Sequence, residues 1–180
     1  MKNKRAFMEG QRHFLRGEYS RSIMSFTHAL RSGMDEDKVH VPLGLAYFKN
    51  TNFTEAVEEF SRALELDPMN DHVLFLRGMA FFNNEEIDRA LDDFNLALRF
   101  NTRRATAYLG RSLALRAMHR DEEAEFDLQT ALDIGGLEVE LFIREYCLTP
   151  HLHGLALTLF DVEKAAWGRE LRADRMGITH

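Results

Sequence analysis

The dipeptide Ala-Leu occurs four times in this chain with a constant 34-residue spacing, as Ala29-Leu30, Ala63-Leu64, Ala97-Leu98 and Ala131-Leu132. No residue is inserted or deleted between one copy and the next. A strict period of this length is typical of stacked helical repeats, in which each unit buries its apolar face against its neighbours. The period therefore predicts an all-α chain built from helical repeats.

Each unit contains two patterns of helical spacing separated by a break. In the second unit, the break falls at Thr51-Asn52, and Pro68 ends the second pattern because proline cannot continue a helix. Asp71 follows as the expected N-cap of the next helix. Pro42 falls inside a first helix, where it removes a hydrogen-bond donor, so we expect that helix to start late or to kink there.

Small residues also recur with the same period, as Gly10, Gly44, Gly78 and Ser112 in the first helices and as Ser22, Ala56, Ala90 and Ala124 in the second helices. Four residues after the second set come Phe26, Phe60, Phe94 and Leu128. Glycine costs a helix about 1 kcal/mol relative to alanine. We therefore expect that the small residues let paired helices approach closely and that the large side chains fill the space between adjacent hairpins.

This pattern resembles the tetratricopeptide repeat (TPR), and the second unit carries most of its motif in Leu43, Gly44, Tyr47, Ala56, Phe60, Ala63 and Pro68. The resemblance implies a right-handed α-solenoid of about four helix-turn-helix repeats plus C-terminal helices. The four units are expected at residues 3–36, 37–70, 71–104 and 105–138, about three quarters of the chain.

The remaining residues depart from the repeat pattern. They are expected to form a helical cap or a groove-filling segment at 139–175 and a frayed tail at 176–180. Thr149 and Pro150 favour a helix start, and a long final helix is expected from Leu152 to about Arg172. Its segment 155–160 is apolar nearly all round, which is typical of a helix buried on more than one side.

The composition excludes several classes of protein. A net charge of −6 argues against a broad nucleic-acid-binding surface. No secretory signal and no apolar run long enough to span a membrane is recognisable in the sequence. The single cysteine, Cys147, cannot form an intramolecular disulfide, and the sequence as a whole favours a cytoplasmic protein.

The sequence contains no recognisable catalytic or cofactor motif. His151 and His153 flank a helix start without a carboxylate or cysteine cluster to complete a metal site, and Cys147 has no base partner nearby in the sequence. The carboxylates of the helices are interpreted as solvated faces. We therefore predict no catalytic residue, no metal, no cofactor and no enzymatic activity.

The resemblance to TPR proteins implies that the first helix of each unit lines a concave surface. By register, the partner-binding groove then contains Phe7, Gln11, Phe14, Lys38, Val41, Leu45, Phe48, His72, Phe75, Met79, Phe82, Leu109, Leu113 and Arg116, with Lys4 and Thr106 at its outer edge. This set predicts an apolar trough with one mildly basic edge, although individual phenylalanines can instead pack between neighbouring first helices. The expected partner is a protein or peptide with an amphipathic helical or extended segment. Substitution of Phe48 or Phe82 by Glu is expected to abolish binding without loss of helicity.

Other interpretations stay open at this stage. One mode of binding is not expected: the trough lacks the Lys, Asn and Arg side chains with which some TPR adaptors clamp the acidic tails of chaperones. The final helix could fill the groove of its own chain or of a second chain, which would give autoinhibition or a homodimer. The chain could also act like the small TPR chaperones of type III secretion systems.

Overall fold

The computed structural model describes residues 2–135, 139–152 and 155 of the 180-residue chain. It divides the chain into unit 1, Met1–Leu137, and unit 2, Glu138–His180, which are described separately. Unit 1 contains eight helices: α1 (Lys2–Leu15), α2 (Tyr19–Arg31), α3 (Glu36–Lys49), α4 (Phe53–Leu66), α5 (Asp71–Asn83), α6 (Ile87–Phe100), α7 (Ala105–Ala117) and α8 (Asp121–Ile134). The prediction of an all-α chain with two helices in each repeat is confirmed.

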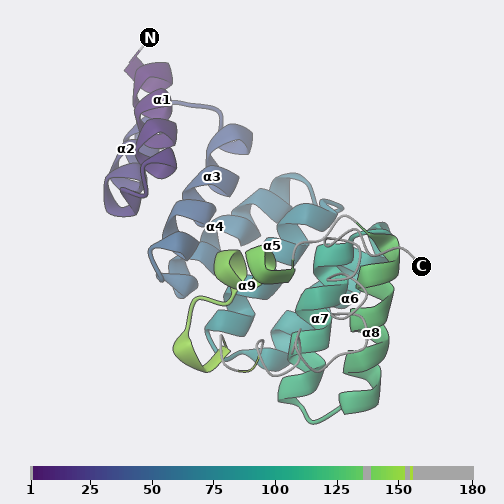
Figure 1. Cartoon of the computed structure of the whole chain (residues 1–180). Helices are drawn as coiled ribbons and strands as arrows, with labels where there is room; N and C mark the ends of the chain where they lie inside the picture. Colours follow the sequence, from purple (N-terminus) through teal and green to yellow (C-terminus); the bar gives the residue numbers. More distant parts are fainter. Residues whose placement is uncertain (1, 136–138, 153–154, 156–180) are drawn as a thin grey trace, which may run out of the picture. The chain divides into compact units, whose positions relative to one another are not determined.

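The eight helices form a row of four hairpins (Figure 1). Within each hairpin the two helices pack against each other, and the second helix of one hairpin packs against the first helix of the next. First helices also contact each other, α1 with α3, α3 with α5, and α5 with α7. A hairpin therefore buries its apolar faces mainly against its sequence neighbours, as expected for a solenoid.

The small residues of the first helices do permit close approach, and their contact partners are the phenylalanine rings of the second helices. A Cβ atom added at Gly44 would lie 2.7 Å from the ring of Phe60, and one added at Gly78 would lie 2.6 Å from the ring of Phe94. Phe94 also lies against Gly110 of the next hairpin, at 2.7 Å from a Cβ placed there. The ring therefore fills the space between adjacent hairpins, as the sequence predicted.

Each hairpin turn contains one residue in the left-handed backbone region, again once per repeat. These residues are Gly17, Thr51, Glu85 and His119, with φ angles of 72°, 61°, 63° and 58°. In the third hairpin, for example, the backbone N–H of Glu86 donates to the carbonyl of Phe81 at 2.9 Å, which closes the end of α5. Only the first hairpin has glycine, the residue that adopts this conformation without steric cost.

Two local predictions were wrong. Helix α3 begins at Glu36 and runs continuously through Pro42 to Lys49, so the late start predicted for it is wrong, whereas the predicted kink stays a prediction. Val39 and Leu43, close to Pro42, are fully buried, so packing against the neighbouring helices outweighs the roughly 3 kcal/mol that an internal proline costs. The cap of α5 is Asn70, whose side-chain oxygen accepts from the N–H of Val73 at 3.1 Å.

Asp71, which the sequence offered as that cap, lies instead at the first position of α5. Its carboxylate accepts hydrogen bonds from Asn101 at 2.9 Å and from Arg104. Asn101 and Arg104 lie in the turn that leads into α7. Asp71 therefore ties the start of one first helix to the start of the next.

Charged side chains also join hairpins at repeated positions. Arg77 in α5 donates two hydrogen bonds to Asp93 in α6, at 2.7 and 2.8 Å, and a third to Ser61 in α4 at 3.1 Å. Burial raises the pKa of the Asp93 carboxyl, and the hydrogen bonds from Arg77 oppose that effect. The pair is mostly shielded from water, with Asp93 buried and Arg77 half-buried.

In unit 2 the structure describes helix α9 (Val139–Tyr146) and the start of a further helix at Pro150. The N–H of Leu152 donates to the hydroxyl of Thr149 at 3.4 Å, which confirms that Thr149 caps this helix. The rest of the predicted final helix, including the apolar segment 156–160, lies outside the described residues.

The glycine–phenylalanine contact predicts a strong coupling between Gly44 and Phe60. Because the ring of Phe60 is fully buried, it has no space to move away from a larger residue at position 44. We expect Gly44→Ser to lower the free energy of unfolding by about 1–3 kcal/mol, as overpacking does. The fourth hairpin has Ser112 and Leu128 at these positions, so Phe60→Leu in the same chain should recover part of the loss. A double-mutant cycle in urea measures the coupling, and simply additive effects would contradict the close contact.

The left-handed turn residues predict a gain in stability at Glu85. In this backbone region a non-glycine residue destabilises the fold by about 1–2 kcal/mol relative to glycine. Part of the gain from a glycine substitution is lost, because glycine gives the unfolded chain more conformational entropy. We expect Glu85→Gly to raise the free energy of unfolding by about 0.5–1 kcal/mol. Glu85→Ala is the control, because alanine keeps the strain and should bring no such gain in urea-induced unfolding.

Candidate functional site

An open apolar hollow of about 370 Å³ lies between the first two hairpins, and we call it the α1–α3 groove. It is lined by Gln11, Phe14 and Leu15 from α1, by Phe26 from α2, and by Pro42 and Leu45 from α3. Gln11, Phe14 and Leu45 were predicted from the sequence to line a groove, and the structure brings these three together. Leu15 and Phe26 were not predicted as lining residues, and Pro42 was expected only to disturb its helix.

The groove has a buried floor, half-buried walls and an exposed rim. Phe26 forms the floor with an exposed fraction of 1%, and its ring packs against that of Phe7 at a centroid distance of 5.5 Å. Phe14 and Leu45 are half-buried in the walls, whereas Leu15 on the rim is 85% exposed. Phe26 also lies against Gly10, where an added Cβ atom would be 2.6 Å from its ring.

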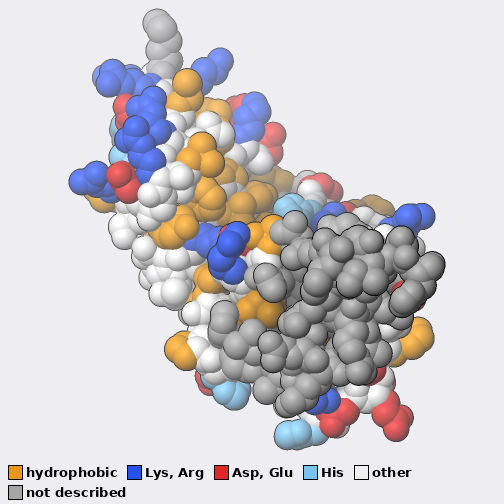
Figure 2. Space-filling model, in the orientation of Figure 1, with side chains coloured by type: hydrophobic (Ala, Val, Ile, Leu, Met, Phe, Trp, Pro, Cys, Tyr) orange, Lys and Arg blue, Asp and Glu red, His pale blue; other side chains and the backbone are white. Residues whose placement is uncertain are grey.

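Basic side chains surround this part of the molecule. Residues 2–31 contain seven Lys or Arg against two Asp or Glu, although the whole chain has a net charge of −6. Figure 2 shows hydrophobic side chains along the strip between α1 and α3, with Lys and Arg side chains gathered over the first hairpin. Lys4 and Arg12 on α1 and Arg16 just after it are exposed. The apolar groove therefore lies beside a hairpin with a net positive charge.

The predicted basic edge is partly neutralised at the start of α3. Lys38 is exposed and forms an ion pair with Asp35, and the hydrogen bond to that carboxylate raises the pKa of Lys38. Lys4 lies close enough to help lower the pKa of Asp35, after the larger effect of Lys38. Val41 is half-buried one turn further along α3.

The remaining predicted groove residues lie deeper in the structure. Phe48, Phe75, Met79, Phe82, Leu109 and Leu113 each have an exposed fraction of 1% or less. Phe75 packs against Phe94 at a centroid distance of 6.2 Å, and a Cβ added at Gly110 would lie 3.2 Å from the sulfur of Met79. Part of this apolar set therefore packs between neighbouring helices of unit 1, and its role in binding stays a prediction.

The two polar residues predicted at the far end of the trough have partners of their own. His72 is exposed, stacks on Phe75 and lies 3.4 Å from Arg104. Partial desolvation, followed by the charge of Arg104, lowers the pKa of His72. Arg116 forms an ion pair with Asp121 at 3.0 Å.

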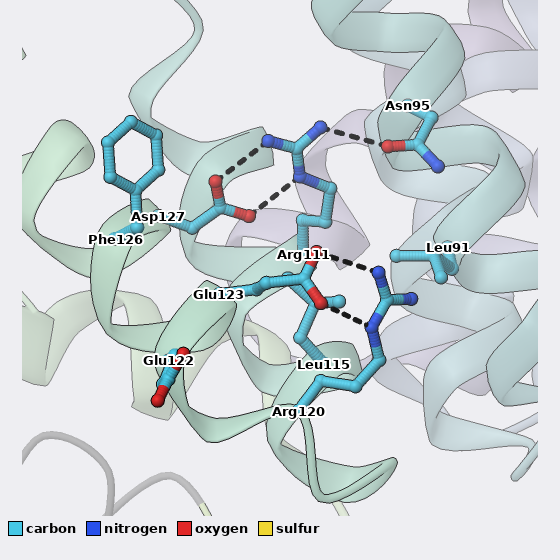
Figure 3. A pocket seen from close by; sticks show the side chains of 9 residues that line it. All are labelled: Leu91, Asn95, Arg111, Leu115, Arg120, Glu122, Glu123, Phe126 and Asp127. Atoms are coloured by element: carbon cyan, nitrogen blue, oxygen red, sulfur yellow. Dashed lines mark hydrogen bonds and ion pairs between the residues drawn. The ribbon is translucent and has the colours of Figure 1, made fainter.

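A second hollow, of about 420 Å³, lies between α6 and α8 above α7 (Figure 3). Arg111 crosses it and donates to Asp127 at 2.6 and 2.7 Å and to Asn95 at 2.9 Å. This arrangement repeats that of Arg77, because all three positions are shifted by one full repeat. Neither Arg77 nor Arg111 was predicted from the sequence, although the recurrence of Arg and Asp after 34 residues could have indicated both.

The described residues offer little to catalysis. Among them, no group of three or more His, Cys, Asp or Glu could hold a metal ion. Cys147 is buried, and burial raises the pKa of its thiol to about 12, so the reactive thiolate is scarce at neutral pH. None of the described helices combines the length and the apolar character needed to cross a membrane.

Comparisons with known proteins agree with this architecture. Residues 41–106 match the family model of the tetratricopeptide repeat. Among solved structures, MamA AMB-1 is 29% identical with a TM-score of 0.63, and the match covers 76% of this chain and 75% of that one. MamA from Desulfovibrio magneticus RS-1 is 12% identical with a TM-score of 0.70, covering 73% and 75% of the two chains.

YrrB, described as a TPR protein with an unusual peptide-binding site, is 24% identical with a TM-score of 0.66, and the match covers 77% of this chain and 71% of that one. No curated protein matches the chain. The strict repeat register, the four helical hairpins of unit 1 and the match of residues 41–106 together show that the chain has the fold of a tetratricopeptide repeat solenoid.

Proposed function

We propose that this protein is an interaction scaffold that binds an amphipathic segment of a partner protein in the α1–α3 groove. One observation carries the proposal: an apolar hollow of about 370 Å³ is open at the surface and bordered by Leu15, which is 85% exposed. Contiguous exposed apolar surface of this kind usually marks a site of interaction. A bound segment would remove this surface from water.

The shape of the groove suits insertion of apolar side chains from a helix or an extended strand. The half-buried side chains of Phe14, Pro42 and Leu45 would contact the sides of an inserted residue, and Phe26 would contact its end. Recognition of this type places a few apolar anchors of the peptide in a hydrophobic groove. Gln11 is exposed at the groove and could form a hydrogen bond with the peptide backbone.

Charge adds a second requirement on the partner. Lys4 and Arg12 on α1 and Arg16 in the turn after it are exposed, so acidic residues next to the apolar anchors would be attracted. We propose an acidic amphipathic segment as the ligand. YrrB is a protein of the same fold that is described as having a peptide-binding site, which makes the fold compatible with this use.

The other predicted groove residues fall into two groups in this proposal. Phe7, Lys38 and Val41 lie at or near the surface of the first two hairpins and would extend the contact. The buried set, from Phe48 to Leu113, would support the helices that carry the groove. Arg116 and His72 would add polar contacts further along the predicted trough.

The burial of Phe48 and Phe82 makes them unsuitable positions for a test of binding. Phe48 and Phe82 have exposed fractions of 1% and 0%, so a glutamate at either position would place a charge in the core. Such a change destabilises the fold by several kcal/mol. We therefore expect these two variants to lose stability as well as binding, and half-buried Leu45 is the better position for a binding test.

Leu45→Glu is expected to weaken peptide binding at least about 10-fold, which corresponds to about 1.4 kcal/mol, because it places a carboxylate in the apolar groove. The probe is a helical peptide selected from a displayed library against the wild-type protein. Its affinity for wild type and variant is measured by fluorescence anisotropy, and circular dichroism checks that both remain helical.

Leu66→Glu is the matched control, because Leu66 is 51% exposed at the end of α4 and does not line the groove. This variant should bind the peptide as the wild type does. Equal affinity of the wild type and Leu45→Glu for every selected peptide would overturn the proposal. Selected peptides that lack acidic residues would contradict the role proposed for Lys4, Arg12 and Arg16.

A further inference from the structure

The outer side of α2 carries an exposed basic stripe with an apolar centre. It consists of Arg21, Met24, His28 and Arg31, which are all exposed and follow helical spacing. Met24 has an exposed fraction of 72%. This stripe does not line the α1–α3 groove, to which α2 contributes the inward-facing Phe26.

Helix α8 carries the opposite combination at the other end of the row of hairpins. Its exposed residues Glu122, Glu125, Phe126, Gln129 and Asp133 form an acidic stripe, and Phe126 at its centre is 70% exposed. The sequence of α8 contains six Asp or Glu and no Lys or Arg. Phe126 and Glu122 also border the hollow between α6 and α8, together with Leu91 and Leu115 (Figure 3).

Met24 and Phe126 occupy the same position of the repeat. The two internal repeats have Glu58 and Asp92 at this position, and both are exposed. The chain therefore has a carboxylate on the two internal second helices and a large apolar side chain on the two terminal ones. This distribution singles out the two ends of unit 1 as contact surfaces.

We infer that the α2 stripe of one molecule docks on the α8 stripe of a second copy of this chain. Met24 would insert beside Phe126 and Leu91, where a thioether can contact the aromatic ring favourably. Arg21 and Arg31 would lie opposite carboxylates such as Glu122 and Asp133. The contact joins two different surfaces, so it is head-to-tail and leaves one free surface at each end of the assembly.

Charge is the reason to assign a second copy as the occupant. Residues 2–31 carry seven Lys or Arg and two Asp or Glu, whereas α8 carries six Asp or Glu and no Lys or Arg. The two ends of unit 1 therefore attract each other. They cannot meet within one molecule, because α3 to α7 separate α2 from α8 in the row (Figure 1).

The test begins with sedimentation of the full wild-type chain from about 5 to about 500 µM, first at about 50 mM and then at about 500 mM salt. We expect a mass that rises above the 20.9 kDa monomer with concentration and falls at high salt. A monomer at every concentration in low salt would overturn the inference.

Two variants then locate the contact. Met24→Glu and Phe126→Glu each remove one of the two surfaces, so each alone should associate at least about 10-fold more weakly than the wild type. A mixture of the two should form a species of two chains and no larger, because one intact α2 stripe and one intact α8 stripe remain. Association that survives in either variant alone, or a mixture that stays monomeric, would contradict the head-to-tail contact.

Met69→Glu is the matched control, because Met69 is 65% exposed in the turn before α5 and belongs to neither stripe. It should associate as the wild type does, and so should Leu45→Glu in the α1–α3 groove. Loss of association in Leu45→Glu would place the contact in the groove and overturn the assignment to α2 and α8.

Discussion

The close contact between a glycine of the first helix and a phenylalanine ring of the second helix, present in the first three hairpins, underlies the rest of the structure. Gly10 with Phe26, Gly44 with Phe60 and Gly78 with Phe94 leave no space for a Cβ atom. Each contact brings two helices together and buries the ring completely. Phe94 reaches Gly110 as well, so the same ring that closes one hairpin positions the next. The 34-residue period of the sequence therefore reflects one packing contact that recurs from repeat to repeat.

The same arrangement explains where surface remains open. An internal hairpin has a neighbouring hairpin on both sides. The first hairpin of unit 1 has one neighbouring hairpin, whose helix α3 packs against α2. Apolar residues of α1 such as Leu15 consequently stay exposed, and Phe75 at an internal position does not. The α1–α3 groove and the α2 stripe both belong to this less covered hairpin, but they lie on different helices and serve different proposed partners.

Local sequence signals succeeded where a single short-range interaction decides the outcome. Thr149 caps its helix, and the repeated breaks mark the hairpin turns. They failed where packing at a distance competes. Pro42 has the pattern of a helix breaker, yet the burial of Val39 and Leu43 keeps α3 continuous. Asp71 has the pattern of a cap, yet Arg104 at the start of α7 holds its carboxylate while Asn70 caps the helix.

The 34-residue period predicted two helices per repeat and the small residues that let them meet, and the resemblance to TPR proteins implied that the first helices carry the groove. Only the tertiary structure decided which groove positions remain open. Leu45 and Phe48 lie one turn apart on α3, but Leu45 is half-buried at the groove and Phe48 is 1% exposed. Exposure depends on how completely neighbouring helices cover a position, and residue type and spacing do not contain that information. The charged ends of unit 1 could be read from the chain, but their exposed apolar centres, Met24 and Phe126, became apparent only in the folded protein.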